Sequence, residues 1–210
     1  MAQAIVRGQG SALPAITVAD RSGPLPLSFS QQRLWFLAQM EGGSEAYHIP
    51  VGLRLKGELD EDALRRSLDR IVARHEALRT RFVTEEGQAV QRVASADVGF
   101  ALDRVDLQGQ ADREQALATL SEREANTPFD LAHGPLIRGR LVKLGEQEHV
   151  LLITMHHIVS DGWSQGVLAR ELGALYEAYR SGGEDPLPAL PIQYADYAVW
   201  QRRWLDGAEL

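Results

Sequence analysis

The chain has 210 residues, of which 44% are hydrophobic and 24% charged, as is ordinary for a globular protein of one or two domains. Its formal net charge of -7 argues against a nucleic-acid-binding protein, because neutralising phosphates needs clustered lysine and arginine. It contains no cysteine, which excludes disulfides and thiolate sites and favours a cytoplasmic protein, and it has no apolar run of the ~20 residues that a membrane helix needs.

The N-terminal part of the sequence predicts an arm followed by a short helix. Residues 1–26 are rich in alanine, glycine, proline and polar residues, so we expect a linker or an extended arm there. Ser30 can cap the helix that follows, because Leu34 and Leu37 lie at helical spacing behind it.

The middle of the chain mixes predicted strands with predicted helices. Strict apolar alternation over residues 49–55 indicates a half-buried strand, and residues 60–76 form the clearest amphipathic helix, with Asp60 as its cap. Further strands are expected at 80–83, 89–93 and 137–144, and a further helix at 111–126. This intermixing predicts an α/β or α+β fold.

The most apolar predicted strand leads directly into two histidines. Residues 149–155 are apolar and rich in branched side chains, which indicates a central, buried strand. We expect a helix over 163–180, a loop over 181–191 and a last helix over 195–206. His156 and His157 therefore lie where a buried strand ends, which is where α/β proteins often place reactive groups.

The run from His156 to Gly162 leaves several interpretations open. Successive strand residues point to opposite faces, so only one of the two histidines can face a given cleft. The run is compatible with a buried histidine pair followed by a helix-capping aspartate. A metal site fits poorly, because adjacent strand residues splay apart and no further ligand is nearby. Ser160 and Ser164 could be nucleophiles, although serines are common at helix caps.

Four segments resemble, in the same order, the motifs of condensation domains from nonribosomal peptide synthetases. They are residues 28–37, 74–82, 155–164 and 194–200, and the third contains the family's His-His-x-x-x-Asp-Gly signature. The resemblance implies a chloramphenicol acetyltransferase-like fold of two lobes, each an α+β sandwich with a mixed sheet flanked by helices. Residues 27–210 then correspond to the N-terminal lobe, the C-terminal lobe has no counterpart, and residues 1–26 resemble a linker from an upstream carrier domain.

The resemblance also implies an activity and partners. Condensation domains form the peptide bond between aminoacyl and peptidyl thioesters, whose phosphopantetheine arms belong to carrier domains and act as substrates. No metal and no cofactor bound by this lobe are implied. The implied partners are the upstream and downstream peptidyl carrier domains, the missing C-terminal lobe and an adjacent adenylation domain. Alone, the lobe is expected to be inactive and to self-associate through its uncovered apolar wall.

The family's motif assigns roles to particular residues. His157, the second histidine, accepts or positions the proton of the attacking amine; whether it is a base or a hydrogen-bonding anchor stays open. Asp161 is expected to be structural and to pair with Arg74 or, failing that, with Arg79.

The two remaining residues of the signature have expected roles too. His156 is expected to pack inward, and Gly162 to allow a tight backbone path and let its amide approach the developing oxyanion. A related histidine-dependent acyltransferase or epimerisation domain, and a non-catalytic lobe that docks carrier domains, are the alternatives that the sequence leaves open.

Overall fold

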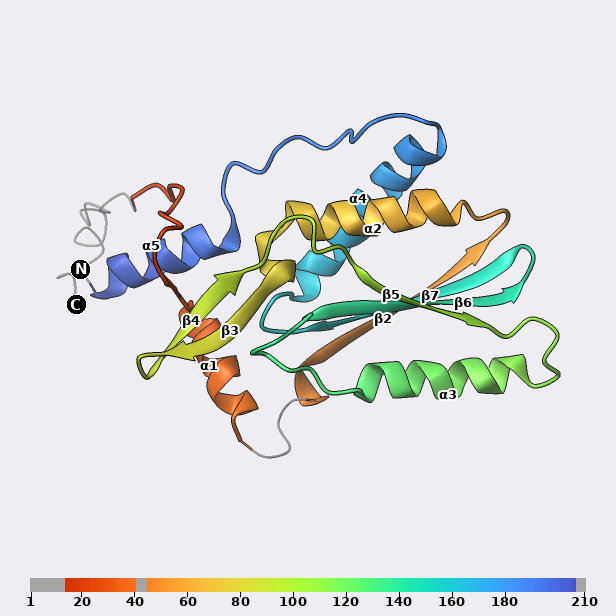
Figure 1. Cartoon of the computed structure of the whole chain (residues 1–210), viewed down its shortest axis with the longest axis horizontal. Coiled ribbons are helices and arrows are strands. Elements are labelled where there is room, and N and C mark those ends of the chain that lie inside the picture. The colour runs from red at the N-terminus through yellow and green to blue at the C-terminus, as the bar shows by residue number, and fades with distance from the viewer. Residues whose placement is uncertain (1–13, 41–44, 207–210) are drawn as a thin grey trace, which may run out of the picture.

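The structure, a computed structural model, describes residues 14–40 and 45–206. A twisted four-stranded sheet lies between helices, and a small three-stranded sheet extends it at one end (Figure 1). The helices are α1 (Phe29–Ala38), α2 (Glu61–Arg74), α3 (Arg113–Asn126), α4 (Gly162–Arg180) and α5 (Tyr194–Asp206), with 3-10 turns at Glu45–Tyr47 and Glu76–Arg79. The strands are β1 (Leu25–Pro26), β2 (His48–Lys56), β3 (Thr80–Glu85), β4 (Gln88–Val93), β5 (Ala101–Asp106), β6 (Ile137–Gly145) and β7 (Glu148–His156).

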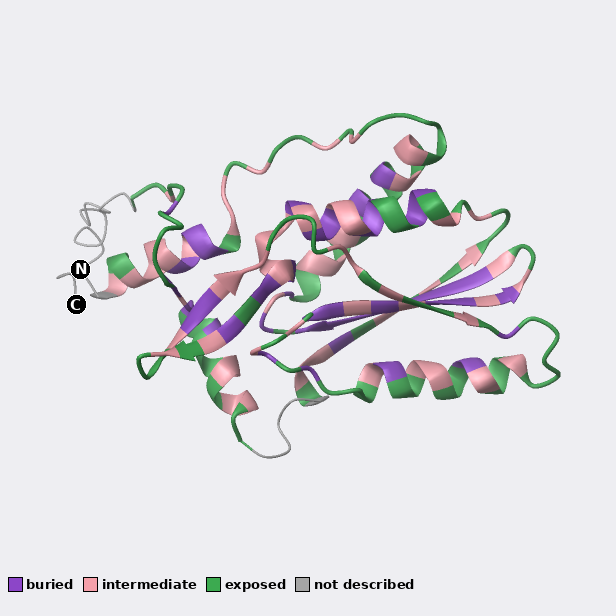
Figure 2. Cartoon of the chain, viewed as in Figure 1, coloured by how far each residue is buried: buried purple, intermediate pink, exposed green. Residues whose placement is uncertain are grey.

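Strand β7 is the centre of the larger sheet. The strand order is β2-β7-β6-β5, with β7 antiparallel to both neighbours and β5 parallel to β6. Every residue of β7 from His149 to His156 is buried (Figure 2). This confirms the predicted central strand, whose side chains need apolar cover on both faces.

Helices α2 and α4 cover one face of this sheet, and α3 covers the other (Figure 1). On the first face Leu68 of α2 and Leu175 of α4 pack in one cluster with Leu151 of β7. On the second face Leu117 of α3 packs with Leu152. The two side-chain sets of β7 thus alternate between the layers, as the period of a strand requires.

The small sheet, ordered β1-β4-β3, joins the larger one through an apolar cluster of its own. Phe82 of β3 is fully buried there beside Leu27, Leu136 and Ile158. Ile158 belongs to the segment after β7, so this cluster holds that segment against the small sheet and helix α1.

The predicted N-terminal arm is attached to the lobe at several points where the structure describes it, although most of residues 14–24 are exposed. The backbone N–H of Ala19 donates to Asp196 at 2.9 Å, and Arg21 pairs with Asp196 at 2.7 Å and with Glu76 at 2.8 Å. Leu25–Pro26 forms strand β1 against β4. The boundary expected at residue 27 stays a prediction, and residues 1–13 of the expected linker lie outside the described residues.

Two predicted helix ends differ from the structure. Helix α1 is capped by Ser28 and not by Ser30, because Gln31 completes a reciprocal capping box with Ser28. Helix α2 begins after Asp60 as predicted but ends at Arg74, where the chain tightens into a 3-10 turn. None of the helices within residues 14–40 and 45–206 has the length and apolar character to cross a bilayer.

Candidate active site at the end of strand β7

Residues 157–161 connect the buried strand β7 to helix α4 and form the floor of the site. The N–H of His157 donates to the carbonyl of Tyr47 at 2.8 Å, and the N–H of Val159 donates to the carbonyl of His156 at 3.1 Å. Ile158 is anchored in the apolar cluster beneath. These three attachments hold the backbone of the loop, so the Cα atoms that bear its side chains have fixed positions.

His156 faces inward, as predicted. Its side chain is fully buried, and its Nδ1 accepts the N–H of Ile158 at 3.1 Å, so the proton of the neutral ring is on Nε2. The rings of His48 and Phe129 have their centres 6.1 and 6.0 Å from it. Burial, with smaller contributions from His48 and His157, lowers the pKa of His156 to about 4, so the ring is neutral at neutral pH.

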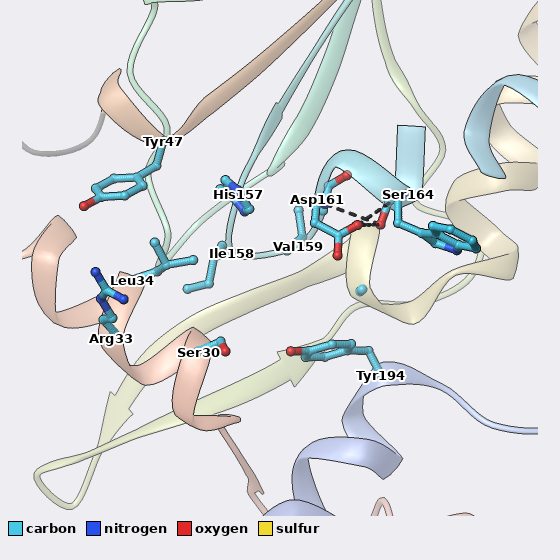
Figure 3. A pocket seen from close by; sticks show the side chains of 13 residues that line it. Ser30, Arg33, Leu34, Tyr47, His157, Ile158, Val159, Asp161, Ser164 and Tyr194 are labelled. Carbon is cyan, nitrogen blue, oxygen red and sulfur yellow. Dashed lines mark hydrogen bonds between the residues drawn. The ribbon is translucent and has the colours of Figure 1, made fainter. Parts of the chain in front are cut away.

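His157 is exposed and lines a hollow of about 540 Å³ (Figure 3). One step along the chain therefore separates a buried imidazole from one that solvent reaches. Tyr47 lies on one side of His157 and Asp161 on the other, while Ser30 and Arg33 of helix α1 and Tyr194 of helix α5 face them across the hollow (Figure 3). Of the two histidines, the second is the one available to a ligand.

Asp161 caps helix α4. Its Oδ1 accepts the N–H of Ser164 at 2.8 Å and the hydroxyl of Ser164 at 2.6 Å (Figure 3). These two bonds, together with the charge of His157, lower the pKa of the Asp161 carboxyl. The capping interpretation is thus confirmed, and Asp161 is exposed to the hollow instead of buried in an ion pair.

The predicted pairing of Asp161 with an arginine is wrong. Arg74 is buried between helices α2 and α4, where it bonds Glu171 at 3.1 Å and the carbonyl of Pro188 at 2.5 Å. Arg79 donates to the carbonyl of Ala94. Both guanidinium groups are therefore engaged elsewhere, and the hydrogen bonds that Asp161 accepts come from Ser164.

Gly162 is the first residue of helix α4. Its backbone does not have the left-handed conformation that requires glycine, and a Cβ built on it meets nothing within 4 Å. The predicted need for a tight backbone path is therefore wrong within this lobe. The approach of its amide to an oxyanion stays a prediction.

The two candidate serines differ. The hydroxyl of Ser164 is engaged by Asp161, as helix-cap serines commonly are. The hydroxyl of Ser160 is buried and has no hydrogen-bond partner within the described part of the chain. Across that same part, no group of three or more histidine, aspartate or glutamate side chains is placed to hold a metal ion.

Sequence reasoning gave no role to three residues that line the hollow: Arg33, Tyr47 and Tyr194. Arg33 and Tyr194 belong to the segments that resemble family motifs, and this was the available signal. Burial raises the pKa of Tyr194, whose hydroxyl lies 3.0 Å from that of Ser28. Tyr47 had no signal, since its position depends on the turn before strand β2.

Comparisons with known proteins agree with this geometry. The family profile described as Condensation domain matches residues 21–210. The chain is 57% identical over 191 residues to malpibaldin synthetase of Mortierella alpina, covering 91% of this chain and 3% of that synthetase. The chain thus spans a small fraction of the curated relatives it matches.

Solved structures show the same fold. The X-domain from teicoplanin biosynthesis, also solved in complex with OxyB, superposes with a TM-score of 0.82 at 37% identity, over 92% of this chain and 41% of that one. The first condensation domain of the calcium-dependent antibiotic synthetase, in complex with a substrate analogue, gives a TM-score of 0.77 at 26% identity, over 90% and 46%. The predicted two-lobe superfamily is thereby confirmed, and the chain belongs to the condensation domain family.

Proposed function

We propose that this lobe supplies the histidine for peptide-bond formation between two carrier-tethered thioesters in nonribosomal peptide synthesis. The observation that carries the proposal is His157, an exposed imidazole held on a fixed backbone at the edge of a large hollow. The second lobe of the condensation domain closes this hollow. This chain aligns with 41% and 46% of the two solved relatives. The rest of each relative is long enough to form a second lobe of similar size, which supports this part of the proposal.

The chemistry needs little from the protein besides placement and one proton acceptor. The α-amine of the acceptor attacks the thioester carbonyl of the donor, and a carbon–nitrogen bond forms while the carbon–sulfur bond breaks. An α-amine has a pKa of about 8, so about a tenth of it is neutral near pH 7 and the rest must lose one proton before it attacks. Bringing two tethered reactants together can contribute ~7–11 kcal/mol.

His157 holds or accepts the proton that leaves the amine as the new bond forms, and the thiolate of the donor arm takes up a proton on release. Asp161 keeps the start of helix α4 in place, and the Gly162 amide lies at the positive end of that helix, where developing negative charge on the carbonyl oxygen is favoured. The phosphopantetheine arms, the carrier domains on both sides, an adenylation domain and a cytoplasmic location belong to the same proposal.

The test is His157→Ala in the condensation domain that contains this lobe, assayed with loaded carrier domains. We expect dipeptide formation to fall about 10²–10⁴-fold, the usual contribution of a general base. The melting temperature should not change, because the side chain is exposed. His133→Ala is the matched control, since His133 is also exposed and does not line the hollow. Undiminished turnover in the His157 variant would remove this residue from the mechanism.

A second candidate function is docking without catalysis. It is favoured by the X-domain, one of the solved relatives, whose complex with OxyB shows the same fold bound to another protein. Titration of loaded carrier domains separates the two functions. Binding without dipeptide by the unaltered domain supports docking, whereas dipeptide that His157→Ala abolishes supports catalysis.

A further inference from the structure

A second, smaller hollow of about 260 Å³ adjoins the one that His157 lines, and we call it the side recess. The two hollows share five lining residues: Ala77, Val159, Ser160, Ser164 and Tyr194. The remaining lining residues are apolar except for His75: Ile71 and Leu78 come from the α2 side, Met155 from β7, and Val167 and Leu168 from α4. The recess is thus an apolar branch of the proposed reaction site.

A buried network of hydrogen bonds fixes the spacing of helices α2 and α4, which form two walls of the side recess. Glu171 of helix α4 bonds Arg74 of helix α2 at 3.1 Å and His75, which follows α2, at 2.6 Å. Arg74 and Glu171 are both buried, so the distance between the two helices is fixed. The recess therefore keeps its width when it is empty, as preformed ligand sites do.

Ser160 stands at the junction of the two hollows. Its side chain lines both of them, it is 8% exposed, and its hydroxyl has no partner within the described residues. Buried hydroxyls are normally hydrogen-bonded, and leaving one unpaired is unfavourable. The neighbouring serine shows the usual solution, because Ser164 is bonded to Asp161. The Ser160 oxygen is itself covered, so a ligand in the hollows reaches it only when the side chain rotates toward them, and the unpaired hydroxyl gains a partner by doing so.

We infer that the side recess receives the apolar side chain of one of the two reacting aminoacyl groups, and that the Ser160 hydroxyl bonds a polar backbone atom of that same group. This rests on the proposed function, since the substrate must have its reacting centre at His157. The side chain of an aminoacyl group begins on the α-carbon, which is bonded directly to the amine or the carbonyl that reacts. A recess that adjoins the hollow lined by His157 is therefore close enough to receive that side chain. Ser160 is then a positioning residue, and Val167 and Leu168 determine specificity.

The first test fills the recess. Val167→Phe, in the condensation domain containing this lobe, should lower kcat/KM for a leucyl substrate relative to a glycyl one by at least about tenfold, as a blocked apolar pocket does. Ala169→Phe is the matched control, because Ala169 is an exposed residue of the same helix outside both hollows. Varying the acceptor with the donor fixed, and then the reverse, shows which thioester uses the recess. An unchanged leucyl-to-glycyl ratio in both arms overturns the inference.

The second test removes the hydroxyl without changing the walls. Ser160→Ala should lower kcat/KM for the leucyl substrate about tenfold, the effect of losing one hydrogen bond, while the melting temperature stays equal or rises. Ser160→Thr restores a hydroxyl and should recover activity in part. A structural hydroxyl would behave in the opposite way, with lower stability and unchanged kinetics, and that result contradicts the role of Ser160.

The outcomes for the recess and for the proposed function are distinguishable. If His157→Ala abolishes dipeptide formation while Val167→Phe changes no substrate ratio, the recess inference fails and the function stands. If Val167→Phe shifts the ratio while His157→Ala retains full turnover, the recess stands and the role of His157 fails.

Discussion

Two regions of this lobe differ in whether their polar side chains are hydrogen-bonded within the protein. Between helices α2 and α4 the buried carboxylate of Glu171 is bonded on both oxygens, by Arg74 and by His75. At the end of β7, just before the start of α4, His157 is open to solvent, and the buried hydroxyl of Ser160 has no partner within the described residues. The first region thus pairs its polar groups internally, and under the inference above a substrate pairs those of the second.

At the end of β7 the boundary between buried and exposed residues falls on a single peptide bond. His156 is fully buried among His48 and Phe129, and His157 lines the hollow. Figure 2 shows the change from the buried central strand to exposed residues at the start of helix α4. Substitution of a buried group should therefore change mainly stability, whereas substitution of His157 should change mainly activity.

The largest expected effect on stability is in the packed region. Arg74→Ala leaves Glu171 buried beside His75 alone and should lower the free energy of unfolding by about 3–5 kcal/mol. Denaturant unfolding measures it. Arg54→Ala is the control, because the Arg54 side chain is 40% exposed and its loss should cost less than about 1 kcal/mol. Equal losses for the two variants would contradict the contrast between the regions.

A smaller effect is expected at the boundary and depends on pH. The pKa of His156 is about 4 in the folded chain against an ordinary value of 6.5, so both states are neutral above pH 6.5. Between pH 6.5 and 4 the unfolded chain binds a proton that the folded chain does not. The free energy of unfolding should therefore fall as the pH falls, by up to about 3 kcal/mol.

The comparison variant is His156→Asn, whose amide oxygen can still accept the N–H of Ile158. Thermal unfolding of both proteins across this range measures the difference. The asparagine variant should lose less stability on acidification than the parent chain does. Parallel curves would show that His156 does not carry this pH dependence.

The smallest effect is expected in the hollow. Asp161→Ala removes the cap of helix α4 and should lower the free energy of unfolding by about 1 kcal/mol, which a slightly lower melting temperature would show. Asp161→Asn keeps an oxygen for the Ser164 amide and should recover most of that loss. A loss of several kcal/mol in the alanine variant would indicate a buried ion pair, which this geometry does not show.

Regular, strongly patterned elements could be predicted from the sequence. The amphipathic stripe of α2, the apolar run of β7 and the helix after His157 all lie where their periods place them. Strand β5 was missed, because it is an edge strand with a mostly exposed pattern in which Leu102 and Val105 are the only large apolar residues. An edge strand of this kind is defined by pairing with β6, and its own sequence does not show that.

The site was predicted in part for a similar reason. The position of His157 follows from the strand, and the cap at Asp161 was one of the interpretations left open. The partner of Asp161 could not be chosen, because Arg74 and Arg79 have competing acceptors in Glu171 and Ala94 that are distant in sequence. The role of Tyr47 likewise depends on long-range strand pairing.

The attachment of the arm to helix α5 has a consequence for how this segment can come loose. The arm is held at two places: the Asp196 carboxylate accepts the N–H of Ala19 at 2.9 Å, and the Nε1–H of Trp200 donates to the carbonyl of Pro14 at 2.7 Å. Both anchoring residues lie on the same helix, so a motion of α5 would carry the arm with it. Breaking the bonds of Asp196 alone would leave the arm attached at Pro14, and the segment would be freed only when both attachments are lost.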